Sequence, residues 1–169
     1  SPPLSRLVPT ISRPELTADT TETRIGIRRI GIEANRFVIN GEKMFLRGVN
    51  RHQEYPYVGY AISPQADYRD AKRIKEAGFD YVRLSHYPHS PAFMDAADEL
   101  GLVLLDSIPG WQFYNPDPRF REQVLQTCRD MVRRDRNHRS VIAWECSLNE
   151  SQMRKVVLQK LNAAEHEEY

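Results

Sequence analysis

From about residue 37 to the end of the chain, strand-length apolar segments alternate with longer segments of helical periodicity. The expected strands are 44–50, 79–85, 102–108 and 141–148, and the expected helices are 64–77, 90–100, 119–135 and 151–167. Apolar strands that are each followed by a covering helix predict a parallel sheet with both faces buried. The pattern therefore predicts an α/β fold built from four consecutive βα units.

Capping signals and loop lengths favour a barrel over a doubly wound sheet. Ser63 and Ser90 each precede a proline at an expected helix start, and Gly78 and Gly101 follow the expected helix ends. The long polar loops follow the strands, as in barrel enzymes, and the first strand is not followed by a glycine-rich phosphate-binding fingerprint. We expect the first four βα units of a (β/α)8 TIM barrel.

The first 33 residues differ from the rest. Four prolines occur within residues 1–14 and exclude a helix there, and residues 20–33 are rich in Thr, Ile and Arg, which is typical of one or two strands. Asn40-Gly41 is a strong hairpin signal between two apolar runs. We therefore divide the chain into 1–33, the terminal strands of a β-sandwich domain, and 34–169, the half barrel.

Composition excludes several classes of partner. The net charge is +1, so no general field attracts the chain to nucleic acid or a membrane surface. No apolar run approaches the ~18 residues that a membrane span needs. Cys128 and Cys146 form neither a disulfide framework nor a CxxC metal motif, and we expect buried free thiols. The sequence does not indicate a compartment.

Polar side chains follow all four expected strands, at the edge where a TIM barrel carries its active site. A single Arg or His at a strand end is usually a hydrogen-bonded loop residue, whereas four such ends together indicate a site. The residues are Asn50, Arg51, His52 and Glu54 after the first strand, Arg83, His86 and His89 after the second, Asp106 and Trp111 after the third, and Asn149 and Glu150 after the fourth.

Glu150 suits the acid of a glycoside hydrolysis, which needs two carboxyl groups beside the scissile bond. It follows an apolar strand, and Asn149 beside it can bind a sugar hydroxyl. Two alternatives remain open at this point. Glu150 could instead cap the following helix, and Glu145, inside the strand, is a competing carboxylate.

Aromatic side chains gather near the same strand ends and could stack on the apolar faces of sugar rings. Trp111 is the expected platform, although ordinary loop packing would explain any one of these rings. The group is Tyr55, Tyr57, Tyr60, Tyr87, Trp111, Phe113 and Tyr114.

Three motifs, in this order, resemble glycoside hydrolase family 2, the family of β-galactosidases, β-glucuronidases and β-mannosidases. They are Arg47-Gly48-Val49-Asn50-Arg51-His52, then Val82-Arg83-Leu84-Ser85-His86-Tyr87-Pro88, then Asn137-His138-Arg139-Ser140-Val141-Ile142-Ala143-Trp144 running into Asn149-Glu150. The resemblance covers nearly the whole chain, and residues 1–33 resemble the end of the family's immunoglobulin-like domain. Ser107 stands where the family often has Glu.

The resemblance implies a retaining exo-β-glycosidase, most like a β-galactosidase, that acts on a carbohydrate substrate. Glu150 matches the acid/base. The other matching positions, expected to bind substrate, are Asn149, Arg83, His86, Asn50, His52 and Asp106, with Trp111 as the stacking platform. The family's nucleophile ends the seventh strand and would lie beyond Tyr169, so we expect the chain alone to be inactive. The 109–112 loop resembles branches without a metal-binding segment, and neither a metal nor another cofactor is expected.

Two other functions are compatible with the residues. A metal-dependent barrel hydrolase would use His52, His86, His89 and Asp106 as ligands. A non-catalytic half barrel would bind carbohydrate weakly or serve a structural role. In either case a half barrel has two open strand edges, so we expect self-association or pairing with the missing half.

Overall fold

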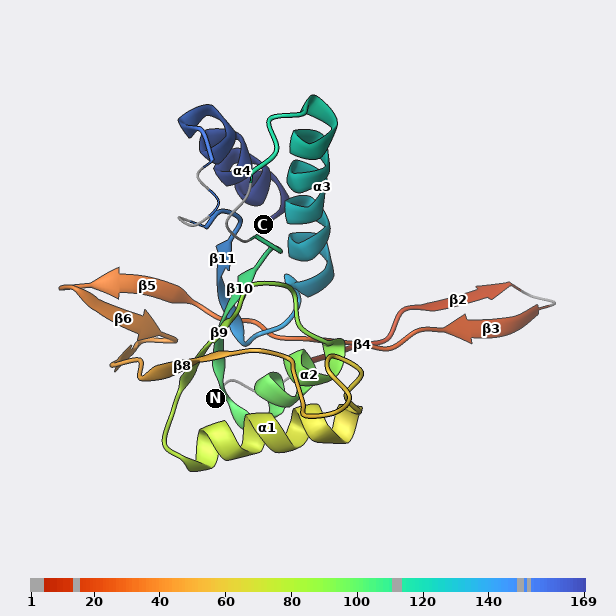
Figure 1. Cartoon of the computed structure of the whole chain (residues 1–169). Coiled ribbons are helices and arrows are strands. Elements are labelled where there is room, and N and C mark those ends of the chain that lie inside the picture. Colours follow the sequence, from red (N-terminus) through yellow and green to blue (C-terminus); the bar gives the residue numbers. More distant parts are fainter. Residues whose placement is uncertain (1–4, 14–15, 111–113, 149–150, 152) are drawn as a thin grey trace.

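The computed structural model describes residues 5–13, 16–110, 114–148, 151 and 153–169. Its centre is a four-stranded parallel sheet in the order β11-β10-β9-β8 (Figure 1). The strands are β8 (Gly48–Arg51), β9 (Tyr81–Leu84), β10 (Val103–Ser107) and β11 (Val141–Glu145). Each strand lies beside its predecessor in the chain, as in a barrel, whereas a doubly wound sheet would reverse direction. The predicted partial TIM barrel is confirmed.

The helices that connect and cover these strands are α1 (Pro64–Glu76), α2 (Pro91–Leu100), α3 (Pro118–Asp135) and α4 (Lys155–Glu168). The predicted caps are present. The side chain of Ser63 accepts a hydrogen bond from Ala66 N, and that of Ser90 accepts one from Phe93 N. Gly101 ends α2 in the left-handed conformation at φ 71°. These signals succeed because each satisfies backbone groups that the helix itself leaves unpaired.

Two expected elements differ in the structure. The strand expected at 44–50 is divided between β7 (Glu42–Met44) and β8. β7 belongs to an antiparallel meander with β5 (Ile30–Glu33) and β6 (Arg36–Ile39), and its hairpin turn is the predicted Asn40-Gly41. The residues of this segment do not reveal that the chain changes its pairing partner between Met44 and Gly48. The fourth helix begins at Lys155, later than expected.

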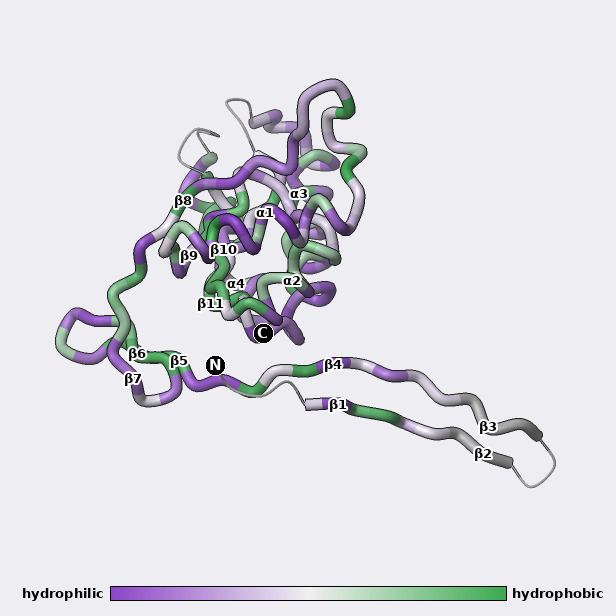
Figure 2. The backbone as a smooth tube through the Cα atoms, turned by 90° about the horizontal axis from the view of Figure 1, so that it is seen from below, coloured by the Kyte–Doolittle hydropathy of each residue, from purple (hydrophilic) through white to green (hydrophobic). Residues whose placement is uncertain are grey.

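The N-terminal segment is an extended antiparallel ribbon that projects from the barrel (Figures 1 and 2). β1 (Ser5–Leu7) pairs with β4 (Thr23–Ile25), and β2 (Thr10–Arg13) pairs with β3 (Leu16–Thr20). The division expected at 33/34 falls at the tip of the β5–β6 hairpin. Whether the ribbon belongs to a β-sandwich stays a prediction.

Two apolar clusters hold the helices to one face of the sheet. The first joins strands β9, β10 and β11 to α1 and α2 and includes Val82, Leu84, Phe93 and Leu104. The second joins α3 and α4 to the segments that follow β10 and β11. Trp144 packs against both clusters. The sheet thus has one covered face and an opposite, inner face that would line the interior of a barrel.

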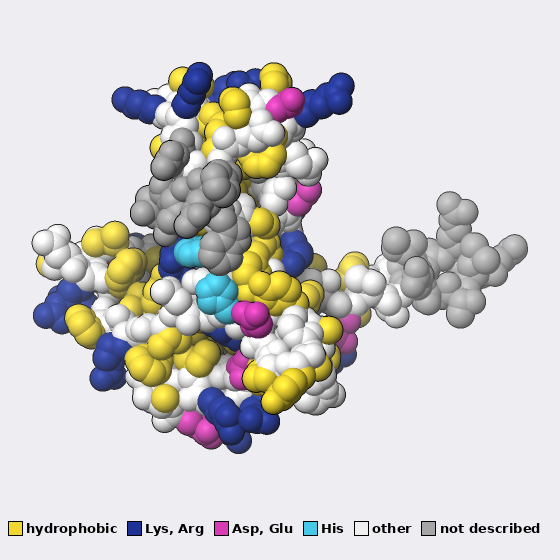
Figure 3. Space-filling model, in the orientation of Figure 1, with side chains coloured by type: hydrophobic (Ala, Val, Ile, Leu, Met, Phe, Trp, Pro, Cys, Tyr) yellow, Lys and Arg dark blue, Asp and Glu magenta, His cyan; other side chains and the backbone are white. Residues whose placement is uncertain are grey.

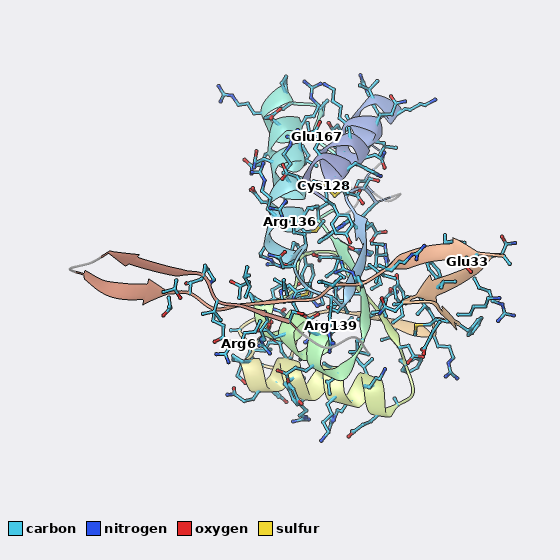
Figure 4. All side chains as sticks on the ribbon, turned by 180° about the vertical axis from the view of Figure 1, so that it is seen from behind. Arg6, Glu33, Cys128, Arg136, Arg139 and Glu167 are labelled. Carbon is cyan, nitrogen blue, oxygen red and sulfur yellow. A yellow bond between two sulfur atoms is a disulfide. The ribbon has the colours of Figure 1, made fainter. Side chains whose placement is uncertain are left out.

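The expectation of free thiols is wrong. Cys128 on α3 and Cys146, directly after β11, form a disulfide with their Cα atoms 5.7 Å apart (Figure 4). The two residues are 18 positions apart in the sequence, a spacing that carries no signal of its own. Packing of α3 against the sheet brings them together. Among the described residues, no helix combines the length and apolar character that a membrane span requires.

Candidate active site

Strand parity decides which polar side chains reach the inner face of the sheet. On β9, Val82 and Leu84 are fully buried beneath the helices, so Arg83 between them points to the inner face. On β8, Val49 packs against the helix-side core, so its neighbour Asn50 also lies on the inner face. Asn50 is the register partner of Arg83, which places these two predicted residues side by side.

Arg83 is held by a carboxylate two strands away. Its Nε and one terminal nitrogen donate to the two oxygens of Glu145, at 3.0 and 2.7 Å. Ser107 Oγ on the intervening strand β10 donates to the same carboxylate at 2.8 Å. Both oxygens of Glu145 are therefore engaged as acceptors, which suits an ionised group that orients Arg83 and does not suit a proton donor.

The network includes Ser107, the position at which this chain departs from the family pattern. Ser107 occupies the position where a Glu is frequent. In this chain a carboxylate does contact that position, and it comes from Glu145 on the neighbouring strand. The sequence indicates Glu145 only as a carboxylate that competes with Glu150 for the acid role, and no local signal links Glu145 to Arg83, 62 positions away.

His52 and His86 come together on the loops that follow β8 and β9. Their ring centroids are 6.5 Å apart, and Tyr87 lies 5.9 Å from His52. Gln53 fastens the two loops, because its backbone N–H donates to the Tyr87 hydroxyl at 2.9 Å and its side-chain oxygen accepts from Ser90 N at 2.7 Å. Histidine side chains are visible at the centre of this face (Figure 3).

The neighbouring polar residues of β8 and the second loop face the helices. Buried Arg51 forms ion pairs with Asp67 at 2.7 Å and Asp70 at 2.9 Å, both on α1. A second terminal nitrogen of Arg51 lies 2.9 Å from His89 Nδ1. Burial, together with the Arg51 charge, lowers the pKa of His89 to about 3, so this imidazole is neutral at physiological pH. Together, these buried interactions of Arg51 attach helix α1 and the loop after β9 to the sheet.

Asp106 lies on the covered face, where it cannot contact a ligand in the barrel interior. Along β10, the side chain of Asp106 points to the opposite face from those of Leu105 and Ser107, and it is fully buried. Burial and the adjacent Asp135 carboxylate at the end of α3 raise its pKa well above the ordinary value. The expectation that Asp106 binds substrate is not supported by this placement. Its position at a strand end did not show to which face it points.

The remaining predicted residues, Trp111, Asn149 and Glu150, lie outside the described residues. Helix α4 begins at Lys155, with Arg154 as its N-cap. The role of Glu150, as acid or as helix cap, stays a prediction.

The ligand set of the metal hypothesis does not converge. His89 contacts Arg51 and Asp106 adjoins Asp135, both on the helix side, whereas His52 and His86 lie together on the loops. Within the described part of the chain, no three His, Cys, Asp or Glu side chains are grouped so that they could hold a metal ion.

A hollow of about 580 Å³ lies at the opposite, N-terminal edge of the sheet, between the β5–β7 meander and the helix-to-strand turns. Arg28, Asp98 and Arg139 are among its lining residues. In barrel enzymes this edge serves stability and the other edge serves chemistry, so we place the candidate site at the strand C-termini.

Comparison with known proteins identifies the family of this chain. The family model described as "Glycosyl hydrolases family 2, TIM barrel domain" matches residues 30–167. A β-galactosidase of Thermoanaerobacterium thermosulfurigenes is 40% identical over 151 residues, which are 89% of this chain and 21% of that protein. A putative β-glucuronidase of Formosa agariphila is 32% identical over 127 residues, 75% of this chain and 15% of that protein.

Solved structures give the same result. A β-glucuronidase from Ruminococcus gnavus in complex with D-glucuronic acid superimposes with a TM-score of 0.87 at 26% identity, covering 98% of this chain and 29% of that one. Bacteroides uniformis β-glucuronidase 3 superimposes with a TM-score of 0.85 at 26% identity, covering 97% and 22%. The chain thus spans about a fifth of the length of the relatives that it matches at 40% identity. With its sheet order, motifs and inner-face polar cluster, this chain belongs to glycosyl hydrolase family 2 and carries part of that family's TIM barrel domain.

Proposed function

We propose that this chain supplies half of the active site of a retaining exo-β-glycosidase, most like a β-galactosidase, with Glu150 as the acid/base. The observation that carries the proposal is the bidentate Arg83–Glu145 pair beside Asn50, on the inner face of the sheet at its C-terminal edge. Glu150 follows Glu145 by five residues on the segment that leaves the same strand.

Each candidate site residue has a defined task in this proposal. Glu145 is already engaged by Arg83 and Ser107, so the proton for the leaving oxygen comes from Glu150. Asn149, Asn50, His52 and His86 bind sugar hydroxyls, and Trp111 stacks on the ring. A double displacement requires a protonated acid and a separate ionised carboxylate that acts as the nucleophile, and Glu145 takes neither role.

The second carboxylate of the double displacement would come from outside these 169 residues. Among the strands that the structure describes, β8 and β11 each pair within the parallel sheet on one side only. Four further βα units would close the barrel on both edges, and without them we expect the chain to self-associate and to have negligible hydrolytic activity. Sedimentation over a range of concentrations tests the association, and a concentration-independent monomer would contradict it.

The proposed sugar is a galactoside. The relatives at 40 and 41% identity are β-galactosidases, whereas the structural similarity to β-glucuronidases is at 26% identity. Comparing kcat/KM for 4-nitrophenyl β-galactoside and β-glucuronide in the parent enzyme decides between them. A preference for the glucuronide would overturn the galactoside assignment and leave the acid/base assignment intact.

Glu150→Gln in the parent enzyme tests the acid role. We expect kcat/KM to fall by about 10²–10⁴ for substrates with poor leaving groups, and much less for activated aryl glycosides, which leave without protonation. Glu145→Gln is the matched control, because it disturbs Arg83 and should slow both substrates by a similar factor. Equal losses for both substrates in Glu150→Gln would contradict the proposal.

A further inference from the structure

We propose that a strip of aromatic rings on the loops after β8 and β9 forms a second carbohydrate subsite, for a neutral pyranose ring on the leaving-group side of the scissile bond. The strip consists of His52, Tyr87 and Tyr60, and Tyr57 is exposed on the same loop as Tyr60. This inference rests on the proposed function and extends it, since an exo-acting glycosidase holds the rest of its substrate outside the pocket for the terminal sugar.

The rings form a continuous path that begins at the candidate site. His52, which faces His86 across 6.5 Å, lies 5.9 Å from Tyr87. Tyr87 in turn makes an edge contact with Tyr60, with ring centroids 5.5 Å apart. A substrate chain that leaves the His52–His86 region along this path would meet aromatic side chains first from the second loop and then from the first.

The outer end of the strip is exposed although it is aromatic. Tyr60 is 59% exposed and Tyr57 is fully exposed, so neither ring contributes much to the core. Tyr57 also has a φ of 71°, in the left-handed region that a bulky side chain rarely adopts. A strained, solvent-exposed aromatic residue on the loop that carries Tyr60 favours a role in binding over a role in stability.

The loop that presents these rings is fastened. Tyr55 and Gly59 exchange backbone hydrogen bonds of 3.0 Å, which close a short hairpin around Tyr57. The Tyr55 hydroxyl donates to Asp70 on α1 at 2.7 Å, and Asp70 is itself paired with Arg51. A preorganised loop loses little conformational entropy when a ligand binds, which suits a stacking platform.

The chemistry of the strip suits a neutral sugar. Tyrosine and histidine rings offer flat apolar faces to the C–H face of a pyranose, together with polar atoms at their edges for its hydroxyls. Burial raises the pKa of the Tyr87 phenol, and the nearby Glu54 carboxylate adds to this effect. The same negative charge would disfavour an anionic sugar at this subsite.

Sugar binding by the 169-residue chain tests the proposal. Ligand-observed NMR titrations compare lactose, which has a second ring, with methyl β-galactoside, which lacks one. We expect lactose to bind about three- to tenfold more tightly, which is the range for one aromatic stacking contact. Tyr60→Ala and Tyr57→Ala should each reduce this ratio toward one and leave the affinity for methyl β-galactoside within twofold.

Two further variants separate stacking from folding. Tyr60→Phe keeps the ring and should keep the lactose preference. Tyr68→Ala removes an exposed tyrosine on α1 that is not part of the strip, and it should change neither affinity. Thermal unfolding midpoints that match the wild type show that each variant is folded.

The possible outcomes distinguish the subsite from the proposed function. If methyl β-galactoside binds and lactose gains nothing, or if Tyr60→Ala behaves like Tyr68→Ala, the subsite is overturned and the proposed function stands. If neither sugar binds the chain, the subsite is also overturned, and the leaving-group test on Glu150 judges the proposed function separately.

Discussion

The two faces of the parallel sheet carry similar polar residues in very different environments. On the inner face, the Arg83 and Glu145 side chains are 23% and 21% exposed, and they border the C-terminal edge where a ligand could reach them. On the covered face, Arg51 and Asp67 are 5% and 2% exposed, and Asp106 is fully buried. Both faces contain an arginine paired with a carboxylate, but only the inner pair borders the proposed sugar site.

The difference teaches that position at a strand end does not define a site residue. Arg51 and Asn50 are adjacent, yet the first attaches helix α1 and the second faces the barrel interior. Side chains alternate between faces along a strand, so a shift of one residue changes a binding group into a structural one. Loss of a covered-face group should therefore reduce stability, and loss of an inner-face group should reduce binding.

The largest expected effect is on the covered face. Arg51→Leu leaves the buried carboxylate of Asp67 without its counter-ion and should lower the free energy of unfolding by about 3–5 kcal/mol, measured by urea denaturation. Arg69→Leu, at an exposed position of α1, is the matched control and should have little effect. A loss below about 1 kcal/mol in Arg51→Leu would break the comparison.

The disulfide on the covered side should have the next largest effect. Reduction by a dithiol, or the Cys128→Ser/Cys146→Ser double variant, should lower the free energy of unfolding by about 3 kcal/mol, because the 18-residue separation closes a loop of moderate size. Thiol titration in denaturant should find no free thiol before reduction and two after it. Two free thiols in the untreated chain would show that the bond is not formed.

Arg83→Met should cost less stability and more function. The Arg83–Glu145 pair is partly solvated, so we expect a loss of about 1–2 kcal/mol in unfolding free energy together with loss of measurable methyl β-galactoside binding. Combining it with Glu145→Gln in a double-mutant cycle isolates the pair. A stability loss as large as that of Arg51→Leu, with sugar binding retained, would contradict the distinction between the faces.

The smallest effect concerns pH. The raised pKa of Asp106 means that the folded chain holds a proton that the unfolded chain releases above about 3.8. The associated stability is complete below pH 3.8 and is lost as the pH rises through the folded pKa, at no more than about 1.4 kcal/mol per pH unit.

Asp106→Asn should remove this contribution, since an amide can donate to Asp135 at any pH. Urea denaturation of both proteins between pH 4 and 8 gives the unfolding free energy of each as a function of pH. The difference between the two curves isolates the contribution of Asp106, because other titrating groups such as His138 are the same in both proteins. If the unfolding free energies of the two proteins change in parallel with pH, Asp106 does not hold a proton in the folded chain and the prediction is wrong.

Local signals in the sequence were sufficient to predict the helix ends and the order of strands and helices. Ser63, Ser90, Gly78 and Gly101 mark helix ends because they act on backbone groups within a few residues. The sheet order followed from the regular alternation of strands and helices, and the order of three motifs was enough to indicate the family.

Information that depends on distant partners was not available from the sequence. Strands buried on both faces lack an alternating pattern, so nothing distinguished the direction of Asp106 from that of Arg83. The Arg83–Glu145 pair joins residues 62 apart, and the cysteine pair depends on how α3 packs. Among the predicted site residues, the structure brings together Asn50 with Arg83 and His52 with His86.

The β5–β6 hairpin determines where the chain can be shortened. Four residue pairs, from Ile30–Ile39 to Glu33–Arg36, join its strands, so a start at residue 34 would remove one strand and expose the edge of the other. A start at Gly26 keeps the hairpin, the Gly26 N–H bond to Asn137 O and the Arg28 contact with Tyr169. Trimming at that glycine would remove the projecting ribbon and keep the β5–β7 meander at the N-terminal edge of the sheet.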